Sequence, residues 1–228
     1  MRVCATPPFS AVAARAAGGA CGRWRPHDLL RVLRIARTQN EPEWVRLALE
    51  RAPWVVVRRA GTAEGFVPIG VRGQERGQRF GTWLHDQDIE SVCSPEDLLQ
   101  RLPQGGRSTL PAFVALAVLR ELPSVLHSLT WGPTGSTGFE LATATPTLSV
   151  TSDLDLLIRL PERCEPAFIG ALAAPLAHAA ARAQTRVDAQ VETPMGGVVL
   201  AELASGKPRV LVRANDGPRL VADPWRAP

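Results

Sequence analysis

Residues 152–159 read Ser-Asp-Leu-Asp-Leu-Leu-Ile-Arg, an apolar run headed by two aspartates, and sixteen residues separate Asp153 from an upstream Gly135-Ser136 turn. In a β-strand successive side chains alternate between faces, so Asp153 and Asp155 are expected on the same face with Cβ atoms roughly 6 to 7 Å apart. Mg²⁺ is usually held by one or two carboxylates together with substrate phosphates and waters. The stretch therefore predicts a Mg²⁺-binding strand and, with it, phosphoryl or nucleotidyl transfer.

The turn before this strand supplies groups that suit a phosphate. Gly135 has no Cβ, so the backbone can approach a phosphate closely and direct N–H groups at its oxygens, and Ser136 adds a hydroxyl donor. We therefore predict Gly135 and Ser136 as substrate-binding residues, and Asp153 and Asp155 as the catalytic, metal-binding pair. The pair alone is weak evidence, because such aspartates at a strand start often face solvent or cap a neighbouring turn.

A third carboxylate lies on a later predicted strand. Residues 187–192 alternate apolar and polar side chains, which places Asp188 on the polar face. Asp188 is the predicted third metal ligand. Arg159 has the same strand parity as the two aspartates, so it could hold a donor phosphate, although a charge at a strand end is more often simply solvated.

Composition and length describe an ordinary globular chain. The 228 residues are 45% hydrophobic and 21% charged, and the net charge of +4 does not by itself indicate nucleic-acid binding. No stretch approaches the roughly 20 apolar residues that span a bilayer, so no membrane association is expected. The four cysteines are scattered, without a C-x-x-C or a nearby His spacing typical of zinc, which indicates reduced thiols in a cytoplasmic protein.

The chain is expected to divide into three parts. Residues 1–22 are basic and rich in Ala and Gly, which predicts a disordered tail or a start codon assigned too far upstream. Residues 104–108, Gln-Gly-Gly-Arg-Ser, are the best linker candidate. An N-terminal recognition domain is therefore predicted over 23–103 and a catalytic domain over 104–228. The expected fold class is α+β, with a small N-terminal α/β module followed by a mixed sheet with flanking helices.

Local patterns predict the individual elements. Apolar residues at helical spacing behind prolines indicate helices, and β-branched or aromatic runs between turn residues indicate strands. Residues 139–146 show no clear helical pattern. The helices are expected at 26–36, 42–51, from Ser94 onward, at 111–122 and at 166–183, the last kinked or split at Pro175; the strands are expected at 54–57, 66–71, 79–84, 153–158, 187–192, 198–203 and 209–213.

The order Gly-Ser, Asp-x-Asp and a third Asp resembles the nucleotidyltransferase superfamily typified by DNA polymerase β, although the gap after the Gly-Ser pair is longer than is usual there. A closer resemblance includes the residues inside that gap. Residues 135–143, Gly-Ser-Thr-Gly-Phe-Glu-Leu-Ala-Thr, followed by residues 152–159, are similar to the signature of the phosphoribosyl-dephospho-CoA transferases, the holo-acyl-carrier-protein synthases of malonate decarboxylase. The likeness continues through 187–194, 26–30 and 68–73 and covers about residues 24 to 225.

This resemblance implies a nucleotidyltransferase-like catalytic domain and a defined reaction. The family transfers the phosphoribosyl-dephospho-CoA group of 2'-(5''-triphosphoribosyl)-3'-dephospho-CoA to a serine of the acyl-carrier subunit of malonate decarboxylase and releases pyrophosphate. It also implies Mg²⁺ shared by Asp153, Asp155 and Asp188, with Gly135 and Ser136 holding the β and γ phosphates.

Two other functions remain open at this point. The chain could be another Mg²⁺-dependent nucleotidyltransferase that modifies a small molecule, tRNA or a different protein. It could also be a non-catalytic assembly factor built on a degenerate transferase fold. The three intact acids argue against degeneracy.

Overall fold

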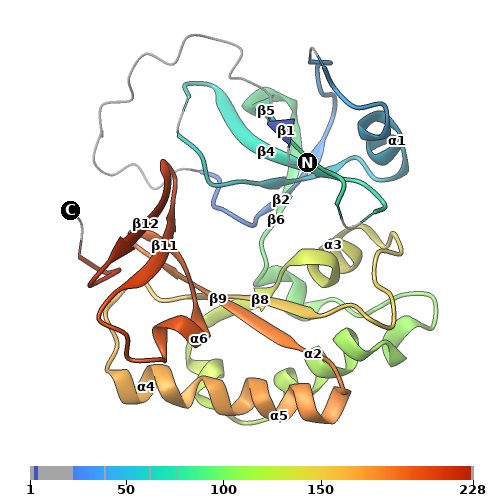
Figure 1. Ribbon diagram of the computed structural model, residues 1–228. Coiled ribbons are helices and arrows are strands. Elements are labelled where there is room, and N and C mark those ends of the chain that lie inside the picture. The colour runs from blue at the N-terminus through green and yellow to red at the C-terminus, as the bar shows by residue number, and fades with distance from the viewer. Residues whose placement is uncertain (1–2, 5–22, 39, 62, 76, 227–228) are drawn as a thin grey trace. The chain divides into compact units, whose positions relative to one another are not determined.

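The computed structural model describes residues 3–4, 23–38, 40–61, 63–75 and 77–226 (Figure 1). The chain forms two compact units, residues 1–94 and 95–228. Each unit contains one six-stranded sheet together with helices, so the predicted α+β class is confirmed. Within the described ranges no helix is both long and apolar enough to cross a bilayer.

The N-terminal unit is a sheet with the strand order β1-β5-β4-β3-β2-β6. Neighbouring strands pair antiparallel, except for β1 and β5, which are parallel. Its elements are β1 (Val3–Cys4), β2 (Leu29–Val32), α1 (Trp44–Arg51), β3 (Trp54–Val57), β4 (Phe66–Arg72), β5 (Arg79–His85), the 3₁₀ turn η1 (Asp86–Asp88) and β6 (Ile89–Cys93).

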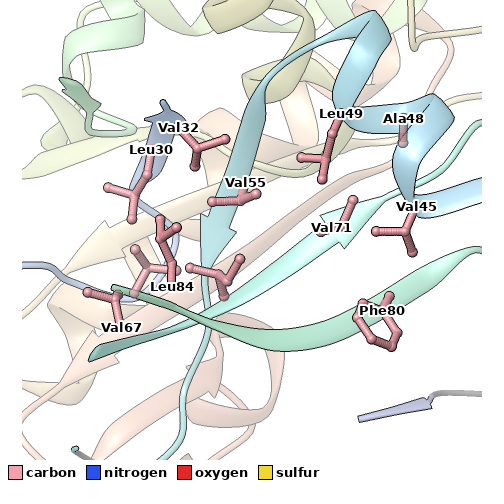
Figure 2. Close-up of a cluster of buried hydrophobic side chains, with 12 residues drawn as sticks. Leu30, Val32, Val45, Ala48, Leu49, Val55, Val67, Val71, Phe80 and Leu84 are labelled. Carbon is pink, nitrogen blue, oxygen red and sulfur yellow. The ribbon is translucent and has the colours of Figure 1, made fainter. Parts of the chain in front are cut away.

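The core of this unit lies between α1 and the sheet (Figure 2). Helix α1 buries Val45, Ala48 and Leu49, which share one helical face because they stand three and four residues apart. Strand β4 buries every second side chain, as expected for a strand with one face in a core. The helix predicted at 42–51 and the three strands that follow it are confirmed.

One prediction for this unit is wrong. The helix expected at 26–36 is strand β2, because its backbone groups pair with β3 on one side and β6 on the other. Partners distant in sequence thus outweigh a local helical spacing. Within the segment predicted as a tail, residues 3–4 form β1 beside β5; the rest of that segment, 1–2 and 5–22, lies outside the described residues.

The division between the units falls after Ser94, whereas the sequence places a linker at 104–108. Pro95 belongs to the second unit because β7 lies directly against it. A Cβ added to Gly132 would stand 1.9 Å from the Pro95 carbonyl oxygen, so this close approach requires glycine.

The residues after Pro95 are held by a helix of the second unit. The Arg120 guanidinium donates to the carbonyl oxygens of Leu98 at 2.9 Å and of Arg101 at 2.8 Å. The segment forms only a 3₁₀ turn, η2 (Asp97–Gln100), in place of the helix predicted from Ser94. Residues 95–101 therefore pack with the C-terminal unit.

The C-terminal unit is a sheet with the order β12-β11-β10-β9-β8-β7, in which β8 and β9 are parallel and the other pairs antiparallel. Figure 1 shows α4 and α5 on one side of β8 and β9, and α3 on the other. After η2 its elements are η3 (Arg107–Thr109), α2 (Pro111–Glu121), η4 (Val125–Ser128), β7 (Thr130–Pro133), α3 (Gly135–Thr143), β8 (Leu154–Arg159), α4 (Pro166–Ala171), α5 (Ala173–Ala183), β9 (Val187–Thr193), β10 (Gly196–Val199), α6 (Leu200–Leu203), β11 (Val210–Ala214) and β12 (Gly217–Val221).

Most predictions for this unit are confirmed, including α2, β8, β9, β11 and the split of 166–183 into two helices. The split lies at Leu172, and Pro175 sits in the first turn of α5, where a missing N–H is tolerated.

Three details of this unit differ from expectation. The strand predicted at 198–203 is β10 followed by the short helix α6, and β12 was not predicted. Helix α3 occupies residues for which no helix was expected. Six consecutive residues of α3, 137–142, are buried, so the helix shows no polar stripe and no amphipathic pattern.

Candidate functional site

The first turn of α3 lies beside the start of β8. Strand β7 pairs antiparallel with β8, with Pro133 opposite Leu156, so the residues after β7 reach the point where β8 begins. The Thr134 N–H donates to the Asp155 carbonyl oxygen at 2.8 Å, and α3 starts at the next residue, Gly135. The Gly-Ser pair predicted as a turn is thus the beginning of a helix held against the strand that carries Asp155.

Gly135 is required at this place for two reasons. Its φ of +58° lies in the left-handed region, which strains residues with a Cβ. In addition, a Cβ at this position would stand 2.0 Å from Oδ2 of Asp155. The Asp155 carboxylate therefore lies directly over the Gly135 backbone, in space that a larger residue would fill.

The N-terminus of α3 offers donors to an anion. The preceding residue, Thr134, makes no side-chain capping hydrogen bond to the helix. The first N–H groups of a helix have no partner within it and carry the positive end of its dipole. Ser136, the second residue of α3, brings a hydroxyl to the same turn. A phosphate is a suitable ligand for this combination.

The predicted third acid is next to Asp155 in the sheet. In the parallel pairing of β8 and β9, Asp155 stands directly opposite Asp188. Leu154 and Leu156, which flank Asp155 in β8, are buried, while Asp155 itself is exposed. Both carboxylates are thus on the accessible face of the sheet, at the end where these two strands begin.

Arg186 joins the remaining aspartate to this group. Its guanidinium hydrogen-bonds the Asp188 carboxylate and lies 3.9 Å from Oδ2 of Asp153. The Arg186 side chain is 70% exposed. Sequence reasoning did not single out Arg186, although its place two residues before Asp188 gives it the same strand parity.

The donor set suits Mg²⁺ in its chemistry. Carboxylate oxygens are the side-chain ligands that Mg²⁺ prefers, and one or two of them are commonly enough alongside substrate phosphates. Within the described part of the chain no three His, Cys, Asp or Glu side chains converge closely enough to hold a metal. Arg186 instead lies between two of the three acids, Asp153 and Asp188.

Two other candidates lie elsewhere. Arg159, predicted as a phosphate-binding residue, is at the opposite end of β8, about 13 Å beyond Asp155 at the usual rise of a strand. Its side chain is 11% exposed, and its guanidinium hydrogen-bonds the Glu96 carboxylate at 3.2 Å. The structure therefore does not bring Arg159 to the group. Trp131 lies four residues before Gly135 in the sequence and would be a natural residue for stacking on an adenine, but it is 4% exposed and belongs to the core.

Comparison with known proteins gives one consistent result. The phosphoribosyl-dephospho-CoA transferase MdcG N-terminal domain matches residues 25–95, and the C-terminal domain of the same family matches residues 99–224. The gap between the two matches, residues 96–98, lies next to the division that the structure places after Ser94. No solved structure matches the chain significantly.

Curated relatives agree with the family matches, and each of those below bears the name phosphoribosyl-dephospho-CoA transferase. A relative from Pseudomonas aeruginosa is 44% identical over 88% of this chain and 93% of its own length. One from Pseudomonas putida is 42% identical over 89% and 96%, and one from Klebsiella pneumoniae is 40% identical over 88% and 96%. The chain belongs to the phosphoribosyl-dephospho-CoA transferase family.

Proposed function

We propose that the chain transfers the phosphoribosyl-dephospho-CoA group from 2'-(5''-triphosphoribosyl)-3'-dephospho-CoA to a serine of the acyl-carrier subunit of malonate decarboxylase and releases pyrophosphate. The observation that carries the proposal is the meeting of the α3 first turn with Asp153, Asp155 and Asp188 at one end of a sheet, in a chain of this transferase family. We place the reaction in the cytoplasm, as the scattered cysteines suggest.

In this reaction the acceptor serine oxygen forms a bond to the phosphorus attached to the ribose. The bond from that phosphorus to the pyrophosphate breaks, and the serine proton must leave. The β and γ phosphates would lie at the N-terminus of α3, against the Gly135 backbone and the Ser136 hydroxyl, where the helix dipole stabilises the charge of the leaving pyrophosphate. Asp188, whose side chain is 51% exposed, is the candidate acceptor of the serine proton.

Asp153, Asp155 and Asp188 would hold Mg²⁺, with Asp153 and Asp155 as the catalytic pair. When bound, the metal would neutralise the triphosphate and stabilise the attacking and leaving oxygens. Arg186 must release Asp153 and Asp188 for these carboxylates to serve as ligands, since its guanidinium occupies both in this structure.

The proposal is tested by mass spectrometry of the purified acyl-carrier subunit after incubation with the triphosphoribosyl donor, Mg²⁺ and the enzyme. The expected result is a mass increment of one phosphoribosyl-dephospho-CoA group on a serine, with release of pyrophosphate. Addition of a plain nucleotide would instead support a nucleotidyltransferase with another donor. No covalent change with any donor would support a non-catalytic assembly factor.

A further inference from the structure

The segment between α3 and β8 connects the two halves of the candidate site. Helix α3 ends at Thr143, and residues 144–153 lead to the start of β8 at Leu154. One end of this path is the Gly135-Ser136 turn and the other is the Asp153–Asp155 pair. Asp155 is held beside that turn by the pairing of β7 with β8. Asp153 precedes the strand, so its position depends on how firmly the intervening loop is held to α3.

Glu140 fastens the middle of this loop to the helix. It lies in α3, is 5% exposed, and accepts the backbone N–H groups of Thr147 at 2.7 Å and of Leu148 at 2.8 Å on a single oxygen. Leu148 is itself 7% exposed, so the loop is anchored in the interior at this point.

Arg107 completes the contact from a third segment, the 3₁₀ turn η3. Its Nε donates to Oε1 of Glu140 at 2.5 Å and its Nη2 donates to Oε2 at 3.2 Å. The same Nη2 donates to the Leu148 carbonyl oxygen at 2.7 Å. One ion pair thus joins helix, loop and η3, and we call Glu140 and Arg107 the Glu140–Arg107 clamp.

The clamp keeps Glu140 ionised inside the unit. Burial alone would raise the pKa of this carboxyl. The hydrogen bonds from Arg107, Leu148 and Thr147, together with the Arg107 charge, outweigh burial and place its pKa below the ordinary value of 4.5. A charged carboxylate binds backbone N–H groups more strongly than a neutral amide does, so the loop is held by charge-assisted bonds.

We propose that Glu140 and Arg107 are positioning residues, which hold the loop that ends at Asp153 and so fix Asp153 relative to Asp155 and the first turn of α3. The inference rests on the proposed function, because those aspartates and that turn are its reacting site. Neither clamp residue belongs to the predicted metal-binding or phosphate-binding set. They act by holding the path between the two halves of that set.

The test compares Glu140→Gln with a matched pair from the other unit. Glu41 and Arg46 form an ion pair of the same kind: Arg46 Nε donates to Glu41 Oε1 at 2.5 Å, the Glu41 side chain is 7% exposed, and Arg46 also donates to the Ile35 carbonyl oxygen. Glu41→Gln therefore removes a similar buried charge far along the chain from α3. Each variant is measured for thermal unfolding, for kcat and KM with the acyl-carrier subunit, and for its Kd for Mn²⁺.

We expect Glu140→Gln to lower kcat about 100-fold, the effect of misplacing reacting groups by about 1 Å, with KM for the carrier within about twofold of wild type. Its Kd for Mn²⁺ should rise at least threefold, which corresponds to a loss of binding free energy about half as large as that of a tenfold change in Kd. Glu41→Gln should lose thermal stability and keep both kcat and the Mn²⁺ Kd. Arg107→Gln removes the bond to the Leu148 carbonyl oxygen but leaves the Thr147 and Leu148 N–H groups bonded to Glu140. It should change kcat and Kd in the same direction by less.

Two results would overturn the inference: Glu140→Gln with an unchanged Mn²⁺ Kd and kcat, or losses in Glu140→Gln no larger than those in Glu41→Gln. If Glu140→Gln does not fold, unchanged kcat and Kd in Arg107→Gln overturn it equally. A wild-type enzyme that transfers nothing to the carrier would refute the proposed function alone. The Mn²⁺ titration then decides the positioning role, and equal Kd values or no binding by either protein would refute it.

Discussion

Replacing Gly135 by alanine should disable the site with only a modest loss of stability. The added Cβ would stand 2.0 Å from Oδ2 of Asp155, and atoms of this kind need about 3.0 to 3.4 Å. The Asp155 carboxylate must therefore move by about 1 Å or more. A displacement of that size in a reacting group costs about 100-fold in rate, so we expect kcat to fall at least that far.

Stability should change for a separate reason. The φ of Gly135, +58°, is strained for alanine and costs about 1 to 2 kcal/mol. Gly206 offers a matched control, because its φ is +67° and a Cβ there would meet nothing within 4 Å. Gly206→Ala should lower the melting temperature of the protein by a similar amount while leaving kcat and Mn²⁺ affinity at wild-type values.

The assay combines single-turnover transfer to the acyl-carrier subunit, Mn²⁺ titration and thermal unfolding of both alanine variants. If Gly135→Ala transferred the group within threefold of the wild-type rate and bound Mn²⁺ equally well, the Asp155 carboxylate could not be acting from the place described above. If Gly206→Ala lost activity to the same extent, backbone strain rather than contact with Asp155 would explain the effect.

Three further predictions concern the charged groups of the C-terminal unit. Asp153→Asn and Asp155→Asn should each abolish transfer while circular dichroism and melting temperature stay near wild type; near-normal transfer would exclude these residues as the catalytic pair. Arg186→Gln should raise Mn²⁺ affinity by up to about fivefold, because exposed ion pairs such as those of Arg186 contribute about 0 to 1 kcal/mol. The control Arg182→Gln on α5 should leave the affinity unchanged. Weaker Mn²⁺ binding by Arg186→Gln would contradict the idea that Arg186 competes with the metal for Asp153 and Asp188. Because the pKa of Glu140 is lower in the folded state, its contribution to stability is complete above about pH 4.5 and is lost as the pH falls further. Urea unfolding should therefore show a stability difference between wild type and Glu140→Gln that is constant at higher pH and begins to shrink below about pH 4.5. A difference that stays the same as the pH falls from about 5 to about 3 would refute the assigned role of the Glu140 charge.

The sequence was most informative where a local pattern matches its structural context. Strands β8 and β9 were predicted because their apolar residues are bounded by polar ones and their alternation is regular. The order of the motifs predicts that Asp155 and Asp188 belong to one site. Their direct register depends on the parallel pairing of two strands joined by α4 and α5. Spacing along the chain cannot specify that register.

Other features of the fold could not be predicted, because they depend on segments that are distant in the sequence. The segment 29–32 forms a strand because its backbone groups hydrogen-bond to β3 and β6. The residues of the segment itself do not indicate which strands will lie beside it. Helix α3 is buried on most sides and contains Gly135 and Gly138, so it lacks the stripe and the propensity by which helices are recognised. Glu140 was not singled out in the sequence, and its partner Arg107 lies 33 residues away in the predicted linker, so no local pattern connects the two.

The long gap between the Gly-Ser pair and the aspartates has a physical explanation in this arrangement. Gly135 is next to Asp155 because β7 and β8 pair antiparallel and the Thr134 N–H bonds the Asp155 carbonyl oxygen, and neither contact depends on how many residues lie between them. The intervening chain must only leave α3 and return to β8 without pulling on either end. A buried ion pair that holds Leu148 to the helix divides that path into two short, anchored pieces, so its length need not loosen the site. The sequence must therefore bring Gly135 into contact with the Asp155 carboxylate. A fixed spacing between the Gly-Ser pair and the aspartates is only one of several ways to achieve this contact.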